Sequence, residues 1–354
     1  MILRDLLRVL GSSRGDGRNL THEEAYRAFD AIFGGGESDI QVAAFLVALR
    51  WKGVTVEELT GFAKAARARA NLPCVNVEGL VCVCPPHDGY GQFPPLEVAS
   101  ALVAAGAGAR VLILCDRCVS PKRGLTAASV LEYLGAGLTW DPAEVEDWVL
   151  RTRFGALASP GMLPAILGLR RVRADIGVRT PLSTVEKLLA PPSAAVVLGA
   201  ERGAVLGTAV EVMQGLGHPR GIAIQGMEGG VTPGVCKRTR GIELEETRQI
   251  PLSVEPADFG LQLGANAELP LFGPPEDDSG PGDNATLVRA AGDCTRAVLA
   301  GETGAARNST LLGAAVILKA AGRCVTLAEG VDAAVTALDS GAASEVLNRL
   351  RELA

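Results

Sequence analysis

Residues 80–84 read Leu-Val-Cys-Val-Cys, and residues 111–114 read Val-Leu-Ile-Leu. Both runs are short and apolar, and the helical run Leu96–Ala105 lies between them. A strand, a helix and a second strand in this order predict two parallel strands joined by a crossover helix. The same alternation continues along the chain. Further strands are predicted at Phe154–Ala158, Ala195–Leu198 and Gly221–Gln225, with helices at Leu125–Leu134, Ala143–Leu150 and Gly203–Leu216.

The chain before residue 73 shows helical patterns only. Three pairs of residues have the spacing of capping boxes, which mark helix starts: Thr21 with Glu24, Ser38 with Gln41, and Thr55 with Glu58. The predicted fold class is therefore α/β, with a small N-terminal helical bundle domain and a larger α/β domain that has a mainly parallel central sheet. We place the helical domain at residues 1–72, where helices from about 160–190 join it, and the α/β domain at residues 73–354.

The apolar residues of the helical domain predict that it associates with a partner. Phe29, Phe33, Phe45 and Leu49 recur at helical spacing on so small a bundle that we expect them to pack partly on a second copy. The predicted assembly is a homodimer through the N-terminal helices.

Composition limits the class of protein. The net charge of the 354 residues is -6, which argues against a simple nucleic-acid coat but leaves room for local basic clusters. The charged start Met1–Arg8 predicts an amphipathic helix, and no apolar run reaches membrane-spanning length, so we expect a cytoplasmic protein with no membrane partner. Eight cysteines are spread along the chain, and we favour a structural role even for the spaced pair Cys115 and Cys118.

Two loops follow predicted strands at the edge of the sheet where ligands bind in parallel α/β proteins. Residues 85–91 follow the first strand, and residues 115–124 follow the second and lead into a helix. The second loop combines Ser120, Lys122, Arg123 and Gly124, which suit a phosphate at a helix start. A solvated turn with a basic tip is the alternative that composition leaves open.

Three segments resemble a known family. Gly15–Thr21 followed by Ser38–Leu46 is typical of the helical domain of anthranilate phosphoribosyltransferases and pyrimidine nucleoside phosphorylases. Asp116–Gly124 is similar to the family segment N-R-x-V-S-S-K-x-G, whose Asn, Ser and Lys hold phosphoribosyl pyrophosphate (PRPP). Val172–Thr180 is similar to V-R-x-x-L-G-x-R-T, whose first Arg contacts the anthranilate carboxylate. The chain thus resembles the anthranilate phosphoribosyltransferase superfamily, glycosyl transferase family 3, with the nucleoside phosphorylase–phosphoribosyltransferase fold. The candidate phosphate or anion site that this resemblance implies consists of Asp116, Ser120, Lys122, Arg123 and Gly89.

The chain departs from the family where metal and pyrophosphate bind. Residues 85–90, Pro-Pro-His-Asp-Gly-Tyr, replace the glycine-rich G-T-G-G-D-G loop, and proline has no N–H to donate to pyrophosphate. Pro94–Glu97 replaces the N-x-S-T element, and Leu163 replaces a His beside the acceptor pocket. Glu228 remains where the family has an Asp-Glu pair, so it is a weak candidate metal ligand. We predict no cofactor, with Mg²⁺ required only if transferase chemistry survives.

The remodelled pattern looks closer to a sister group, the YbiB-like proteins, which share the fold and are regarded as DNA-binding. Between residues 151 and 187 the chain carries mostly basic charges: Arg151, Arg153, Arg170, Arg171, Arg173, Arg179 and Lys187. We interpret this stretch as a polyanion-binding surface of a homodimer, for DNA or RNA, rather than as part of a tryptophan-biosynthesis enzyme. A solvated helix face, with Arg173 and Arg179 in ion pairs, is the structural alternative.

An alternative hypothesis is that the protein is an active enzyme. The chain would be a glycosyl or phosphoribosyl transferase acting on a different anionic acceptor, with displacement at a ribose C1. In it Lys122 holds the phosphate of a PRPP-like phosphorylated small molecule, Arg173 orients a carboxylate, and Asp88 with Glu228 holds one metal. Non-catalytic binding of a small metabolite is a third hypothesis. We interpret His87 as a hydrogen-bonded turn residue.

Overall fold

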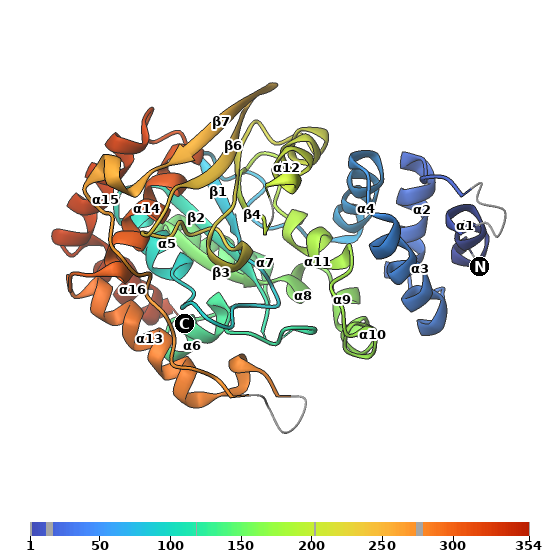
Figure 1. Ribbon diagram of the computed structural model, residues 1–354, viewed down its shortest axis with the longest axis horizontal. Coiled ribbons are helices and arrows are strands. Elements are labelled where there is room, and N and C mark those ends of the chain that lie inside the picture. Colours follow the sequence, from blue (N-terminus) through green and yellow to red (C-terminus); the bar gives the residue numbers. More distant parts are fainter. Residues whose placement is uncertain (1, 12–16, 118, 202, 274–278, 354) are drawn as a thin grey trace.

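The computed structural model describes residues 2–11, 17–117, 119–201, 203–273 and 279–353 (Figure 1). Gly15, Asp16 and Cys118, which the sequence motifs include, lie outside these residues.

An N-terminal helical bundle lies at one end of the molecule (Figure 1). It consists of α1 (Ile2–Leu10), α2 (His22–Phe33), α3 (Asp39–Lys52) and α4 (Val56–Arg69). The capping boxes predicted for the last three helices are confirmed. In each, the cap hydroxyl accepts the N–H three residues on, and the side chain of that residue accepts the cap N–H. Each cap satisfies amides that the helix leaves unpaired, which stabilises it by about 1 kcal/mol.

The bundle buries its aromatic residues within one chain. Phe29, Phe33, Phe45 and Leu49 are all buried, and the ring of Phe29 stacks on that of Phe62 with centroids 4.0 Å apart. These residues therefore need no second copy to cover them, and the homodimer stays a prediction. The large apolar side chains that α3 does expose are Ile40 and Trp51.

A seven-stranded sheet forms the centre of the α/β domain among the described residues. Its strands are β1 (Leu80–Cys84), β2 (Arg110–Cys115), β3 (Phe154–Ala158), β4 (Ala195–Gly199), β5 (Arg220–Ile224), β6 (Thr239–Glu245) and β7 (Arg248–Val254). Their spatial order is β3-β2-β1-β4-β5-β6-β7. The first five are parallel, as predicted, and their bounds agree with the prediction to within about one residue.

The antiparallel hairpin β6–β7 was not predicted. Most side chains of β7 are exposed, and Pro251 lies at its centre, so the strand has neither an apolar run nor regular alternation. β7 forms one edge of the sheet. At the other edge, Thr139 forms a bridge with Leu157 of β3, donating its N–H to Ala156 and accepting that of Ala158.

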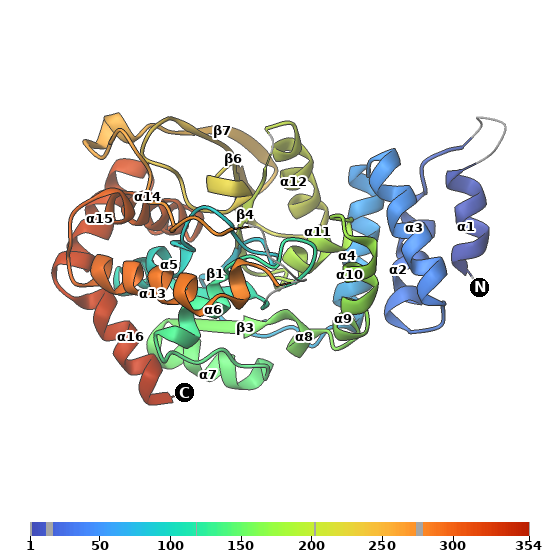
Figure 2. The same cartoon turned by 60° about the horizontal axis from the view of Figure 1, so that its bottom comes forward.

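Helices cover the sheet (Figure 2). They are α5 (Glu97–Gly106), α6 (Ala127–Tyr133), α7 (Pro142–Thr152), α12 (Ala204–Gly215), α13 (Ala285–Leu299), α14 (Ala305–Ala320), α15 (Leu327–Asp339) and α16 (Ala342–Leu353). Helix α5 is almost wholly buried, and α14 packs closely on it. The close approach depends on Gly313, since a Cβ there would lie 2.4 Å from the hydroxyl of Ser100. Among the described residues, no helix combines the length and apolar composition needed to cross a membrane.

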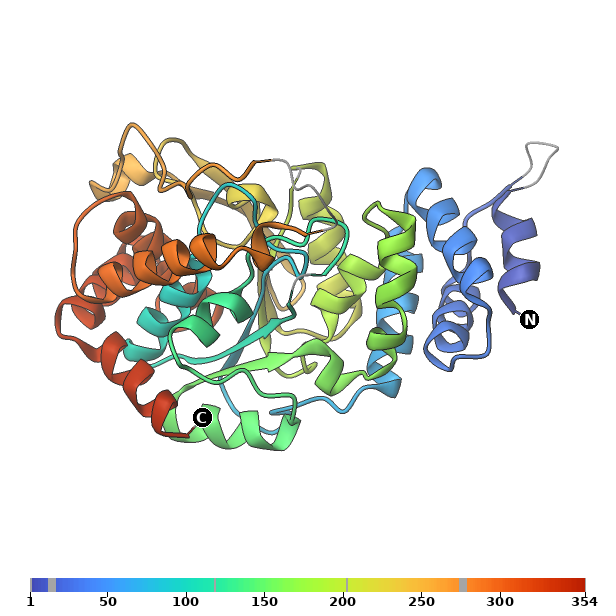
Figure 3. The ribbon, with the colours of Figure 1, turned by 90° about the horizontal axis from the view of Figure 1, so that it is seen from below.

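Four short helices connect β3 to β4 and lie beside the bundle (Figure 3). They are α8 (Ser159–Met162), α9 (Ala165–Gly168), α10 (Arg170–Ile176) and α11 (Leu182–Val185). Helix α10 contacts α3, and α11 contacts α4. The domain bounds 1–72 and 73–354 remain a prediction.

The strand order reverses between β1 and β4. The chain runs outward from β1 to β2 and β3, returns through α8–α11, and then runs in the other direction from β4 to β5. In parallel sheets such a reversal separates the loops at the carboxyl ends of the two central strands and leaves a crevice there. The bundle faces the same region through α4, which contacts α11 (Figures 1 and 2).

Candidate functional site

A cavity of about 210 Å³ lies at this crevice. Its walls come from the loop after β1, the carboxyl end of β4, the helices α11 and α12, and the bundle. The polar and charged side chains among the lining residues are Arg50, His87, Asp88, Arg179, Thr180, Ser183, Thr184, Lys187, Glu201 and Thr208. Two of the basic residues predicted from sequence, Arg179 and Lys187, are therefore brought to one cavity.

Arg179 is held by Asp88. Its Nε and Nη2 donate to the two carboxylate oxygens of Asp88 at 2.5 and 2.6 Å, in a bidentate pair. The carboxylate is buried and the guanidinium is about a quarter exposed. Burial alone lowers the pKa of Arg179, but the hydrogen bond and charge of Asp88 outweigh it and raise that pKa. Asp88 thus fixes the guanidinium at the wall of the cavity.

Lys187 supplies the second cation of the cavity. Its ammonium donates to the carbonyl oxygen of Gly199, at the end of β4, at 3.1 Å. Burial, and then the charge of Arg179, lower the pKa of Lys187 to about 8. The ammonium is therefore charged at neutral pH and has donors left for a ligand.

His87 is buried beside this cavity. Its Nε2 lies 2.6 Å from the hydroxyl of Ser159, the first residue of α8. Burial lowers the pKa of His87 to about 4, so the imidazole is neutral at pH 7. The predicted turn histidine is hydrogen-bonded, but to Ser159 rather than within its own turn. No local sequence pattern indicates this contact, because the two residues are 72 positions apart.

The predicted anion loop lies next to the crevice, and most of its charges are already paired. Asp116 is buried and forms an ion pair with Arg170. Arg123 pairs with Asp283 at 3.0 Å. Ser120 accepts a hydrogen bond at its carbonyl oxygen from Nε of Arg173 at 3.2 Å.

Lys122 contacts Glu228. Its ammonium lies 3.1 Å from the Glu228 carboxylate and also donates to the carbonyl oxygen of Gly89 at 3.3 Å. Gly89 has a φ of +73°, and a Cβ there would lie 2.4 Å from the carbonyl oxygen of Leu125. Glycine therefore lets the loop after β1 pack against the loop that carries Lys122.

Glu228 sits in a cradle of donors. We use this name for the N–H groups of Gly91, Gln92 and Phe93 together with the ammonium of Lys122. The three N–H groups donate to the Glu228 carboxylate at 2.9 to 3.2 Å. Burial raises the pKa of Glu228, but these hydrogen bonds and Lys122 outweigh it and hold the pKa below its usual range. The carboxylate is thus ionised, and both of its oxygens accept hydrogen bonds.

The residues do not fit magnesium. Glu228 has both oxygens engaged by donors, and Asp88 has both engaged by Arg179. In this arrangement the oxygens of both carboxylates are engaged by donors, and the sharing of one metal by Asp88 and Glu228 stays a prediction. Within the described part of the chain, no group of three or more His, Cys, Asp or Glu residues is placed to hold a metal ion.

Arg173 is not available to a ligand. It is 3% exposed and forms an ion pair with Glu186, which is 1% exposed. Its remaining donors contact Ser120 and, at 3.1 Å, the hydroxyl of Ser183. We therefore correct its predicted role: Arg173 belongs to a buried ion pair that ties α10 to the segment after α11.

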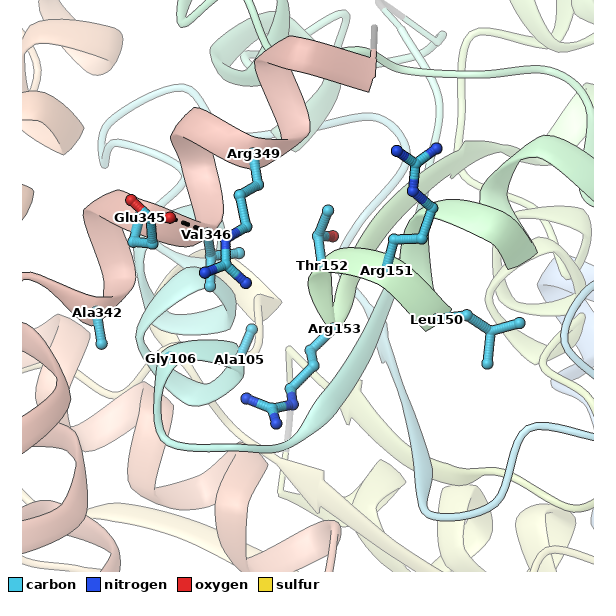
Figure 4. Close-up of a pocket in the computed structure, with 10 residues that line it drawn as sticks. All are labelled: Ala105, Gly106, Leu150, Arg151, Thr152, Arg153, Ala342, Glu345, Val346 and Arg349. Carbon is cyan, nitrogen blue, oxygen red and sulfur yellow. Dashed lines mark hydrogen bonds and ion pairs between the residues drawn. The ribbon is translucent and has the colours of Figure 1, made fainter.

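The remaining basic residues do not form one surface. Arg171 is highly exposed and lies 3.7 Å from Asp175, one helical turn on. Arg151 and Arg153 line a separate cavity of about 260 Å³ between α5, α7 and α16, together with Arg349 (Figure 4). Arg151 also pairs with Asp147. The stretch that looks continuous in sequence is thus divided among different parts of the fold.

Two buried polar residues near the site were also missed. Tyr90 and Glu97 are both fully or almost fully buried, and Tyr90 packs against Gly230. Burial raises the pKa of Glu97 to about 8, so this carboxyl is protonated at neutral pH. Cys115 is buried at the end of β2, and burial raises the pKa of its thiol, which agrees with a structural role.

The fold and the crevice are those of a two-domain transferase: a helical bundle faces the strand ends of a parallel sheet, and cations line the space between. Residues 12–70 match the family described as glycosyl transferase family, helical bundle domain, and residues 89–344 match its a/b domain. The chain belongs to this glycosyl transferase family.

Several similar proteins are anthranilate phosphoribosyltransferases. The anthranilate phosphoribosyltransferase of Solibacter usitatus is 33% identical over 344 residues, which is 95% of each chain. That of Acetivibrio thermocellus is 30% identical over 341 residues, 95% of this chain and 93% of its own. The crystal structure of anthranilate phosphoribosyltransferase from Thermus thermophilus superposes with a TM-score of 0.80 at 28% identity, over 99% of this chain and 98% of that chain.

These relatives correct the functional interpretation. We expected a polyanion-binding protein, for DNA or RNA, as the main function. The relatives along 95% of the chain are enzymes, and the predicted basic surface is broken up into ion pairs and separate cavities. The nucleic-acid interpretation is therefore wrong.

Proposed function

We propose that the protein is a glycosyl or phosphoribosyl transferase that acts on an anionic acceptor other than anthranilate. The observation that carries the proposal is the cavity at the β1–β4 crevice, with Arg179 and Lys187 on its wall. It lies where α/β proteins bind ligands, and the chain shares its family with transferases.

The acceptor would bind in this cavity. The ammonium of Lys187 keeps donors free for an acceptor carboxylate, whereas Arg173, the family's carboxylate-binding position, is closed by Glu186. In this cavity Lys187, rather than Arg173, would contact the acceptor carboxylate. A cation at a different position and with a different side-chain length supports an acceptor of different shape.

The donor would be a phosphorylated sugar such as PRPP. The yeast anthranilate phosphoribosyltransferase has been solved in complex with PRPP and Mg, and it shares this fold at 16% identity with a TM-score of 0.78. In the proposed reaction the acceptor attacks the ribose C1, the bond from C1 to the pyrophosphate oxygen breaks, and pyrophosphate leaves with the electron pair. Lys122 is the cation placed to contact the phosphate side. We assign no step to a metal.

The test is pyrophosphate release from PRPP, with and without Mg²⁺, against a panel of carboxylated aromatic and heteroaromatic amines, with anthranilate as the reference. Lys187→Met should lower kcat/KM on the best acceptor on the order of 10- to 100-fold, since a hydrogen bond to a charged group is worth about 1.5–3 kcal/mol. Lys64→Met, an exposed lysine of α4, is the matched control and should leave the rate unchanged.

Two results would refute the proposal. One is the absence of pyrophosphate release with every acceptor at millimolar PRPP. The other is equal activity of wild type and Lys187→Met on all acceptors that react.

We also keep the homodimer as a proposal. It is supported by the exposure of Ile40 and Trp51 on α3, because large apolar side chains on one helix favour association. Light scattering tests it, and a monomer mass at micromolar protein would refute it.

A further inference from the structure

The cradle has the geometry of an anion site. Three successive N–H groups, from Gly91 to Phe93, converge on one point, and the ammonium of Lys122 reaches the same point from another loop. Successive N–H groups that form a concavity are a common anion-binding arrangement, and a nearby ammonium adds full charge. The anion that they hold is a side chain of the protein itself, Glu228.

Glu228 reaches the cradle from a strained backbone. Its φ of 48° and ψ of 29° lie in the left-handed region, which non-glycine residues rarely adopt. It stands in a glycine-rich segment, between Met227 and Gly229, just beyond β5. Such strain persists where local contacts compensate for it, and the four donors of the cradle supply those contacts.

Glu228 also lines a cavity. Its volume is about 420 Å³, and its walls include Phe93, the segment 226–229 and Asn266. Three cationic side chains, Lys237, Arg238 and Arg240, belong to the same walls. A carboxylate that left the cradle would thus enter a space with compensating positive charge.

We propose that the cradle is a phosphate-binding site that the Glu228 carboxylate fills, and that a phosphorylated ligand enters by displacing this carboxylate toward the adjoining cavity. The ligand class is a phosphate or pyrophosphate group of a small molecule. This inference rests on the proposed function, since it says how the donor side of the same site is controlled. Glu228 acts as a tethered competitor for the phosphate.

A phosphate group competes well for these donors. A carboxylate presents two oxygens, whereas a terminal phosphate presents three and carries more negative charge, so it uses the three N–H groups and Lys122 more fully. Displacement also releases Glu228 from its left-handed backbone. The apparent affinity of the wild-type protein is then the intrinsic affinity reduced by the small fraction of molecules with an open cradle.

The experiment is calorimetric titration of the full-length protein with inorganic pyrophosphate, in buffer with a chelator so that no divalent metal contributes. Glu228→Gln removes the competing charge, and Glu228→Gly removes the side chain while suiting the left-handed backbone. Both variants should bind pyrophosphate more tightly than wild type, on the order of 10-fold or more. The added change Lys122→Met should abolish the gain.

Glu268→Gln is the matched control. Glu268 is exposed, and its carboxylate accepts a hydrogen bond from the side-chain amide of Gln92 at 3.3 Å rather than from the N–H groups of the cradle, so its loss removes an equal charge beside the cradle. Pyrophosphate affinity of this variant should stay within about twofold of wild type, as expected for an exposed, screened charge.

The outcomes separate this inference from the proposed function. Equal pyrophosphate affinity in wild type and both Glu228 variants would overturn the inference, as would an equal gain in Glu268→Gln. A gain limited to the Glu228 variants supports it even if no acceptor is ever turned over, in which case only the proposed function fails.

Discussion

Replacing Arg173 by Met should destabilise the protein far more than the same change at Arg171, two residues earlier on α10. Arg173→Met leaves the buried Glu186 carboxylate without its partner, and breaking a buried pair costs about 3–5 kcal/mol. The hydrogen bonds to Ser120 and Ser183 are lost as well, and their energies do not add to this cost because they belong to the same network. The Arg171 guanidinium is 86% exposed and lies 3.7 Å from its partner, so its loss costs about 0–1 kcal/mol.

Urea unfolding followed by circular dichroism measures the difference. With an unfolding slope of about 3 kcal/mol per molar urea, Arg173→Met should lower the midpoint by about 1–1.7 M, and Arg171→Met by about 0.3 M or less. The double variant Arg173→Met/Glu186→Gln should recover part of the loss, because no uncompensated charge then stays buried. Equal midpoints for the two single variants would refute the structural role of Arg173. A double variant no more stable than Arg173→Met would show that the buried charge of Glu186 is not the source of the loss.

Three further outcomes are expected. Gly89→Ala should lower the free energy of unfolding by about 2–4 kcal/mol, because its Cβ would meet the Leu125 carbonyl and its φ is positive. Gly168→Ala is the control: its Cβ meets nothing within 4 Å, so its free energy of unfolding in the same urea titration should be close to that of wild type. The unfolded chain binds a proton at His87 near pH 6.5 and the folded one only near 4, so stability should be full above pH 6.5 and fall by about 1.4 kcal/mol per unit toward pH 4. In His87→Gln the slope of the unfolding free energy against pH should be smaller by the contribution of about one proton over this range. An unchanged slope would contradict the assignment. Glu97 has the opposite dependence: its raised folded pKa of about 8 makes stability fall as pH rises from about 4.5 to 8, so the stabilisation by Glu97→Gln should grow between pH 5 and pH 8.

Local sequence patterns predicted the parallel strands and the caps because their physical causes lie within a few residues. The cap hydroxyls and their partners are three positions apart, and a buried parallel strand is apolar on both faces. The hairpin β6–β7 lacked such a pattern, since most β7 side chains face solvent.

The candidate site could be located but not interpreted from sequence. Strand ends directed attention to the loops after β1 and β2, and Arg179, Lys187 and Lys122 do lie around the crevice. What each charge does depends on a partner far along the chain: Glu228 and Lys122 are 106 positions apart, and Asp88 and Arg179 are 91 apart. The run of arginines misled us because it crosses short helices that turn its members toward different acids.

The two margins of the sheet have a consequence for how the protein behaves in concentrated solution. At β7, Pro251 offers no N–H to an incoming chain, and at β3 the bridge from Thr139 already uses the backbone groups of Ala156 and Ala158. Each feature interrupts the row of free backbone groups that a foreign strand would need along that edge. We therefore expect the native protein to resist fibril-like growth from either margin of this sheet.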